Sequence, residues 1–339
     1  MPRHAPARLS WCESAAKPPM RTRAAMFLML AIASPAAMAG EAVSVTQTEG
    51  AAVVGAAAND VPGCAPLALD PDALLALKAG GWQLASDRRA ELALALAGCL
   101  RDPDPQLRDA IAFDALSHWM RAGELDPVTL RALRGRLLPM LDERGEPGFA
   151  APFAALVLAE VARVDRIAPY LDARERAALV EAAAGYLESV RDYRGFDAAQ
   201  GWRHGVAHGA DFALQLILNP AVDATHVQRL LAAVAAQVDA DGRHAYVHGE
   251  SARLAMPVLY AARRGLLDAA QWDAWVAAVA APAPLADWSQ AFSSEAGLAR
   301  LHNTNAFLLV LYASLQESDD ERSRATLLPA VRRALHALP

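Results

Sequence analysis

The stretch DPDPQLRDAIAFDAL, residues 102–116, decides the fold class. Its two Asp-Pro pairs break the chain, because proline cannot continue a helix and restricts the residue before it. After Pro105 the apolar side chains recur at the three- and four-residue spacing of an amphipathic helix. The stretch therefore predicts a sharp break followed by a helix that buries one face.

Similar helical patterns continue on both sides of this stretch. Asp70-Pro71 and Asp126-Pro127 each supply a capping carboxylate and a proline suited to the first helical turn, and Asp172 is a third candidate cap. Further helices are expected over residues 88–100, 153–164, 171–190, 224–238, 251–264, 295–315 and 322–338, with one more around Trp272 and Trp275. No segment has a convincing β-strand pattern, the nearest candidate being residues 43–48.

Each pair of helices is too thin to bury its own apolar face, so neighbouring pairs must stack. The Asp-Pro and Arg-Asp residues of the opening stretch resemble those of HEAT-type repeats. We expect residues 67–339 to form one all-α domain of antiparallel helical hairpins, stacked as a HEAT-like α-α superhelix. The repeats diverge too far for a strict period, which leaves a closed helical barrel as the alternative.

Composition supports helices and argues against two function classes. Hydrophobic residues make up 54% of the 339 residues, much of this Ala and Leu, while aromatic residues make up 6%. The net charge is −6, and no Lys/Arg cluster follows the N-terminal region, which argues against nucleic-acid binding. No later apolar run is long enough to serve as a transmembrane anchor.

Residues 20–39 have the three parts of a secretory signal peptide. Arg21 and Arg23 provide the positive region, residues 24–34 the short apolar core, and Ala37-Met38-Ala39 the small-x-small cleavage pattern. We therefore expect the mature chain to begin at Gly40 and the protein to be periplasmic or secreted.

The chain before and after this signal has no helical periodicity. Residues 1–19 fit no signal pattern, which leaves both Met1 and Met20 as possible starts, and residues 40–66 are expected to form a flexible linker. Export leaves Cys64 and Cys99 in the mature chain, where one disulfide is possible. The alternative is that Cys99, inside an apolar run, is a buried free thiol.

The most unusual stretch is Gly201-Trp202-Arg203-His204-Gly205-Val206-Ala207-His208-Gly209-Ala210-Asp211-Phe212. We expect it to lie on one helix that ends at Asn219-Pro220. At about 100° per residue, His204, His208, Asp211 and Gln215 share one face within about 60°. Because a solvent-facing stripe usually carries Lys and Glu, this one is expected to line a cleft or an interior.

The same stretch contains the pattern Gly-Trp-x-His-x-x-Ala-His-x-Ala-Asp, through which the chain resembles a bacterial family known as domain of unknown function 2785. Supporting segments are residues 100–103, 108–113, 153–159, 194–197, 249–250 and 300–303 with Phe307. The resemblance covers most of the chain from about residue 67. It implies an all-helical fold and carries no known reaction.

One hypothesis for the polar stripe is a metal site. His204, His208 and Asp211 could bind zinc or another first-row divalent ion through two imidazoles and a carboxylate. Further ligands could come from His248, Glu250 or His302. Such a metal would activate water for hydrolysis, with Glu250 as the general base.

The competing hypothesis is a buried hydrogen-bond network, in which Asp211 fixes a histidine tautomer and Asn303 and Glu250 satisfy the remaining groups. The candidate cluster comprises Trp202, His204, His208, Asp211, His248, Glu250, His302 and Asn303. The leading functional interpretation is an exported helical-repeat protein whose groove, lined by this cluster, binds a ligand or a protein partner. The alternatives are a metal-dependent hydrolase and a purely structural periplasmic scaffold.

Overall fold

A computed structural model describes Cys64 and residues 70–339 of the chain. All of these residues lie in one compact unit. The predicted N-terminal extension and signal peptide (residues 1–39), and the predicted linker (residues 40–66) apart from Cys64, lie outside the described residues.

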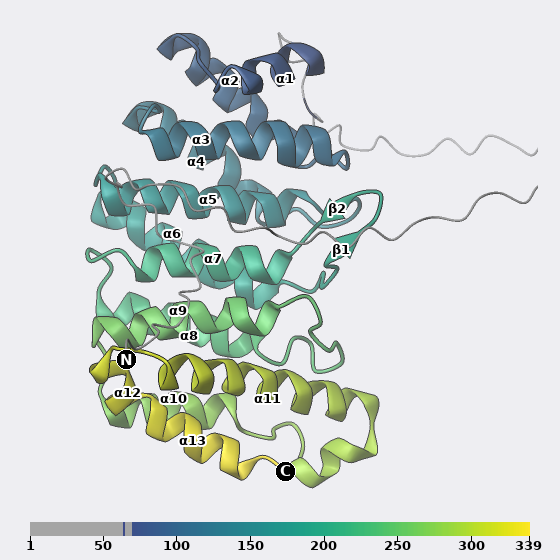
Figure 1. The fold of residues 1–339 in the computed structure, drawn as a ribbon, viewed down its shortest axis with the longest axis vertical. Helices are drawn as coiled ribbons and strands as arrows, with labels where there is room; N and C mark the ends of the chain where they lie inside the picture. The colour runs from purple at the N-terminus through teal and green to yellow at the C-terminus, as the bar shows by residue number, and fades with distance from the viewer. Residues whose placement is uncertain (1–63, 65–69) are drawn as a thin grey trace, which may run out of the picture. The chain divides into compact units, whose positions relative to one another are not determined.

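The described part is mostly helical, as predicted, and Figure 1 shows the helices packed side by side. The α-helices are α1 (Pro71–Ala79), α2 (Ser86–Cys99), α3 (Asp114–Ala122), α4 (Pro127–Met140), α5 (Ala150–Ile167), α6 (Ala173–Ser189), α7 (Gly205–Ile217), α8 (Ala224–Gln237), α9 (Glu250–Arg264), α10 (Ala269–Val279), α11 (Glu295–Gln316), α12 (Glu321–Thr326) and α13 (Leu328–Ala337). A π-helix, η1 (Gln106–Phe113), precedes α3, and a 3₁₀-helix, η2 (Trp288–Ser293), precedes α11. The two strands are β1 (Phe196–Asp197) and β2 (Gly201–Trp202).

The predicted aspartate caps form at the helix starts. The Asp70 carboxylate accepts a hydrogen bond from the backbone N–H of residue 73, and Asp126 accepts from those of residues 128 and 129. Asp172 and Glu175 form a reciprocal capping box at the start of α6. Each cap satisfies backbone donors that the helix itself leaves free, so the sequence signals for these three starts are confirmed.

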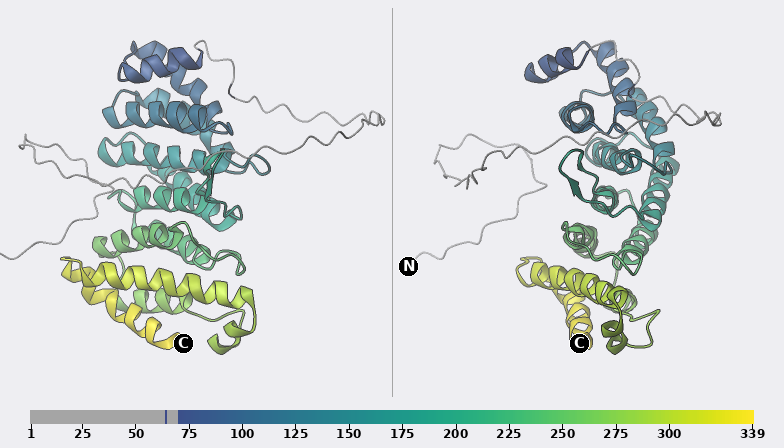
Figure 2. Two further views of the ribbon diagram at one scale, coloured as in Figure 1. Left: turned by 45° about the vertical axis from the view of Figure 1, so that its right-hand side comes forward. Right: turned by 90° about the vertical axis from the view of Figure 1, so that its right-hand side faces the viewer.

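The central helices form two layers, with α5, α7 and α9 in one and α4, α6 and α8 in the other (Figure 2). Within the first layer α7 packs between α5 and α9, and its other side contacts α6. Almost every residue of α7 is buried, including Phe212, Leu216 and Ile217. This position makes α7 a central element, with both of its layer neighbours able to contribute side chains to any site at its surface.

Cys64 and Cys99 are joined by a disulfide. Cys99 is the last residue of α2 and is fully buried, so the bond fixes Cys64 to the core of the first helices. Over the residues that the structure describes, no helix combines the length and the apolar character needed to cross a membrane.

The prediction of a single helix over residues 201–212 is wrong at its beginning. Residues 201–202 form β2, which pairs with β1 in a short antiparallel hairpin that places Phe196 opposite Trp202. The helix starts only at Gly205, because Gly201 (φ 75°) and His204 (φ 53°) have left-handed backbone conformations that a right-handed helix cannot contain. The hairpin also corrects the expectation that the chain forms no strand.

Candidate functional site

Trp202 stands out among the tryptophans of the described chain, because the others are buried or half-buried and it is 42% exposed. Its indole lies parallel to the His204 imidazole, with ring centroids 4.1 Å apart and an interplanar angle of 1°. Phe196, 57% exposed, approaches the indole at 5.1 Å, and the His248 ring meets it edge-on at 5.8 Å. The hairpin thus presents an aromatic surface beside two histidines.

His204 is the N-cap residue of α7, but its side chain forms no capping hydrogen bond. Its Nδ1 atom is buried and has no hydrogen-bond partner in the described part of the chain. Burial lowers the pKa of His204, and the positive charge of Arg253 lowers it further. The imidazole is therefore neutral at pH 7 and keeps unused hydrogen-bonding capacity.

His208 lies one turn further along α7 and is 8% exposed. Its Nδ1 lies 3.1 Å from the carbonyl oxygen of Pro152 on α5; since a carbonyl only accepts, Nδ1 carries the proton. Nε2 is left as an acceptor, with no protein hydrogen bond among the described residues. Burial, followed by the nearby His204 and Arg253, lowers the pKa of His208 to about 3, so this ring is also neutral at pH 7.

Asp211 lies on the next turn of α7 and pairs with Arg253 of α9. The Arg253 guanidinium donates to both carboxylate oxygens, one of them through Nε at 3.1 Å. Burial raises the pKa of Asp211, whereas the charge and hydrogen bonds of Arg253 oppose that shift. A second pair, Arg121 with Glu160, links α3 to α5 in the same way. Sequence reasoning missed Arg253 and Glu160 because only the tertiary fold brings them close.

Glu250 and His248 belong to the loop and first turn that begin α9. The buried carboxylate of Glu250 accepts a hydrogen bond from the backbone N–H of His248 at 2.8 Å, and its other oxygen lies 3.7 Å from His248 Nδ1. The His248 ring packs against Gly195, where a Cβ atom would come within 2.3 Å of it. Gly195 is thus required by close packing, and Glu250 positions His248 next to Trp202.

His302 and Asn303 lie on α11 and serve a different loop. The buried Asn303 side chain accepts from the backbone N–H of Tyr246 and donates to the carbonyl oxygen of His244, each at 2.8 Å. The exposed His302 ring lies 3.3 Å from the Tyr246 carbonyl oxygen. Within the described chain, neither side chain forms a hydrogen bond or ring contact with Trp202. The structure therefore groups five of the eight candidates closely, namely Trp202, His204, His208, His248 and Glu250, with Asp211 adjoining them.

Two of the three predicted metal ligands are engaged with other protein groups. Among the residues that the structure describes, no group of three or more His, Cys, Asp or Glu side chains is arranged to hold a metal ion. Asp211 is bound by Arg253, and His208 uses Nδ1 on α5. A metal held by His204, His208 and Asp211, with Glu250 as the base for its water, therefore stays a prediction.

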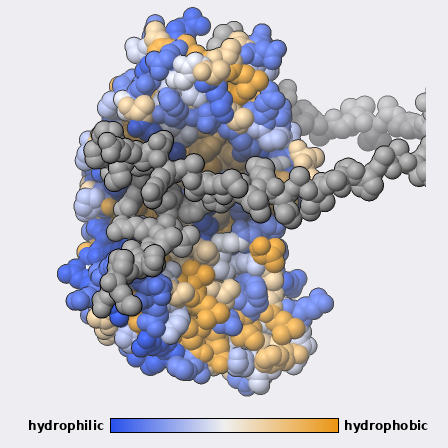
Figure 3. Space-filling model, viewed as in Figure 1, coloured by the Kyte–Doolittle hydropathy of each residue, from blue (hydrophilic) through white to orange (hydrophobic). Residues whose placement is uncertain are grey.

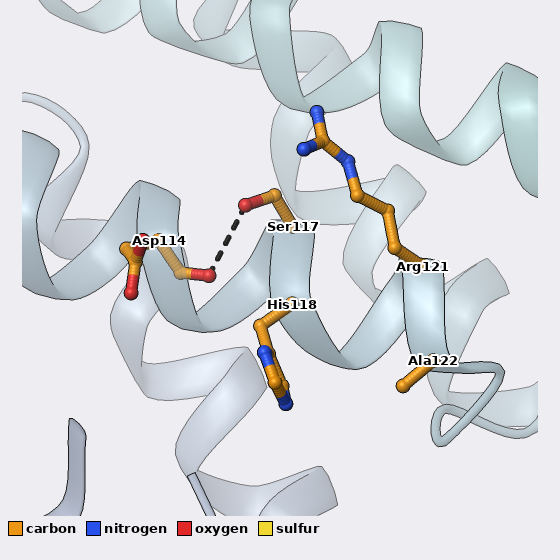
Figure 4. A pocket seen from close by; sticks show the side chains of 5 residues that line it. All are labelled: Asp114, Ser117, His118, Arg121 and Ala122. Carbon is orange, nitrogen blue, oxygen red and sulfur yellow. Dashed lines mark hydrogen bonds between the residues drawn. The ribbon is translucent and has the colours of Figure 1, made fainter. Parts of the chain in front are cut away.

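A shallow hollow of about 360 Å³ lies on α3, lined by Asp114, Ser117, His118, Arg121 and Ala122 (Figure 4). Three of its four polar lining side chains, those of Asp114, Ser117 and Arg121, already have protein partners. The Ser117 hydroxyl donates to the Asp114 carbonyl oxygen, the Asp114 carboxylate accepts from the Trp82 indole, and Arg121 pairs with Glu160. This hollow is therefore a weaker candidate than the surface at Trp202.

Apolar residues gather over the lower part of the face shown in Figure 3. Exposed large side chains in the last third of the chain include Phe292 on η2 and Leu298 and Leu309 on α11. These side chains offer apolar area without the unused imidazole nitrogens that accompany Trp202. Phe292 is therefore a suitable reference for an exposed aromatic residue outside the candidate site.

The fold and the site together define a class: a helical protein in which an exposed aromatic hairpin meets neutral histidines at the start of a central helix. Residues 137–313 match the family described as "Protein of unknown function (DUF2785)", and the chain belongs to that family. The match covers just over half of the chain, from within α4 to within α11, and includes every member of the candidate cluster. No curated protein and no solved structure matches the chain.

Proposed function

We propose that this protein is exported and binds a ligand through the surface formed by Trp202, His204, His208 and His248. The surface lies at one end of α7 and is built from the β1–β2 hairpin and the loop before α9. We further propose that the helices stack as a HEAT-like superhelix, a geometry that commonly presents binding surfaces. The two layers of α4 to α9, which follow each other in chain order, support this arrangement.

The observation that carries the proposal is the exposure of Trp202 beside unsatisfied imidazoles. A large aromatic ring in a soluble protein is normally buried, and a buried polar atom normally has a hydrogen-bond partner. Here the indole is exposed, while the Nδ1 atoms of His204 and His248 are buried without hydrogen-bond partners within the described residues. A bound ligand would cover the indole, and a rotation of the His204 or His248 ring would bring these nitrogens to the ligand.

Binding at this surface can be tested without knowing the ligand. We would incorporate 5-fluorotryptophan and assign the Trp202 signal by its loss in Trp202→Phe. We would then add fractions of a soluble bacterial extract. The proposal expects at least one fraction to shift the Trp202 fluorine resonance in a saturable way. Trp272, which is fully buried, provides the internal control because its signal should not move.

The proposal fails if no fraction shifts the Trp202 signal, or if all fractions that act shift the buried tryptophans equally. An equal shift would indicate a global change in the protein. A saturable change confined to Trp202 would instead locate the contact at the hairpin.

Export is supported by the signal-like residues 20–39 and by the disulfide between Cys64 and Cys99. The test is to express the full chain in a bacterium and determine the mass of the protein recovered from the periplasm and the medium. We expect a chain that begins at Gly40 and contains one disulfide. Recovery only from the cytoplasm, with residues 20–39 present and both thiols free, would contradict export.

A further inference from the structure

We infer that the surface at Trp202 binds a neutral oligosaccharide, stacking a sugar ring on the aromatic hairpin and bonding its hydroxyl groups to His204, His208 and His248. This inference rests on the proposed function and specifies the chemical class of its ligand. It follows from three features of the site: its exposed aromatic area, the hydrogen-bonding type of its imidazoles and the pairing of Arg253 with Asp211.

The aromatic area suits a ligand with a flat apolar face. One face of the Trp202 indole is covered by His204, and the tilted Phe196 ring extends the exposed area on the hairpin. Val247, 71% exposed, adds apolar surface next to His248. Aromatic rings provide a large contact area at low conformational cost, and the C–H face of a pyranose is apolar and of similar size to an indole.

The polar groups around the indole suit hydroxyls. A neutral imidazole has one N–H donor and one lone-pair acceptor, and a hydroxyl group can pair with either. His208 has its acceptor nitrogen left over after Nδ1 bonds to Pro152, and within the described residues His204 Nδ1 has no hydrogen-bond partner. His248 Nδ1 also forms no hydrogen bond there, although a Glu250 carboxylate oxygen lies 3.7 Å from it. His204 and His248 contact the exposed indole directly, and His208 lies next to His204, with ring centroids 6.1 Å apart. Their donor and acceptor nitrogens suit the hydroxyls on the rim of a sugar ring.

The charges at the site favour a neutral sugar over an acidic one. Burial holds His204 and His208 in their neutral forms at pH 7. The Arg253 guanidinium, whose charge acts on both His204 and His208, is already paired with the Asp211 carboxylate. An anionic ligand would have to break that pair or charge a buried imidazole, and each step costs binding free energy. A neutral ligand requires neither.

The experiment uses the mature disulfide-bonded protein on two immobilised panels, one of neutral and acidic oligosaccharides and one of random peptides. Titration in solution then measures the affinity for the tightest neutral glycan. We expect Trp202→Ala to weaken binding at least about tenfold, and Trp202→Phe, which keeps an aromatic face, to weaken it less. His204→Asn, which tolerates the left-handed backbone, should also weaken binding. Phe292→Ala is the matched control and should leave binding unchanged.

The outcomes separate this inference from the proposed function. Binding only to acidic glycans, or binding to neutral glycans that Trp202→Ala and Phe292→Ala reduce equally, would overturn the saccharide assignment. Peptide binding that depends on Trp202, without glycan binding, would keep the proposed function and reject the ligand class. Failure of both panels to show any Trp202-dependent binding would reject both.

Discussion

Two polar regions of this protein contain the same kinds of residues but use them differently. At Asn303, on α11, both ends of a buried amide side chain are bonded to the loop that contains His244 and Tyr246. At His204, before α7, a partly buried imidazole has an unpaired nitrogen and an exposed indole as its closest neighbour. The first region holds the fold together, whereas the second retains bonding capacity that the fold does not use. Satisfaction of hydrogen bonds, rather than residue type, distinguishes them.

The largest effect on stability should come from the satisfied region. Asn303→Ala removes two hydrogen bonds and leaves a buried N–H of Tyr246 and a carbonyl oxygen of His244 without partners. We expect the free energy of unfolding to fall by about 3 kcal/mol, since each orphaned buried group costs roughly 1–3 kcal/mol. Urea denaturation followed by circular dichroism would measure the change.

The neighbouring residue provides the control for this substitution. His302 is exposed, and its contact with the Tyr246 carbonyl oxygen is longer, so His302→Ala should cost less than about 0.5 kcal/mol. Equal losses of stability from Asn303→Ala and His302→Ala would show that the Asn303 amide does not hold the loop. The Asn303 region could then not be called structural.

An intermediate effect on stability is expected at His208. One of its ring nitrogens is bonded, as at Asn303, and the other is free, as at His204. Its pKa of about 3 in the folded protein lies below the ordinary histidine value of 6.5, so the unfolded chain binds more protons between these values. Stability from this residue is complete above pH 6.5 and is lost as the pH falls toward 3. Between about pH 7 and about pH 5 the loss should be roughly 2 kcal/mol.

His208→Gln tests this dependence, because an amide can still donate to the Pro152 carbonyl oxygen but does not titrate. Urea denaturation of both proteins at the two pH values should show a flatter pH dependence in the variant. His302→Gln, at an exposed position, should behave like the unsubstituted protein. If His208→Gln retains the full pH dependence, His208 is not the buried neutral group that the structure shows.

Much of the fold could be predicted from short-range sequence signals. Aspartate followed by proline or by a capping glutamate marks a helix start through local hydrogen bonds, and Asp70, Asp126 and Asp172 all cap helices as expected. The apolar spacing after Pro105 predicted a helix, although not that its first part, η1, is a π-helix. These features depend on residues within one or two turns of each other, which is why the sequence reveals them.

The site was less predictable because its geometry depends on backbone conformation and distant partners. The two-residue strands are too short to show an alternation of polar and apolar residues. No side-chain pattern in the sequence indicates the positive φ of His204. A helical wheel put His204, His208 and Asp211 on one helix, whereas His204 precedes α7 and only His208 and Asp211 lie on it. The wheel also could not show that Arg253 binds the carboxylate. That pairing turns an apparent metal trio into an ion pair and two neutral imidazoles.

Trp202 should affect stability less than Asn303 or His208, although it should have the largest effect on binding. The exposed indole stacks on His204, and such an aromatic pair contributes roughly 0.5–1.5 kcal/mol when well formed. Because the ring is partly in water, we expect Trp202→Ala to lower the free energy of unfolding by less than about 1 kcal/mol, below the loss at Asn303. Urea denaturation of both variants under one set of conditions gives the ratio directly. If Trp202→Ala lowered the free energy of unfolding as much as Asn303→Ala, the indole would be a structural element. A residue whose role is to bind a ligand should contribute little to the stability of the unbound protein.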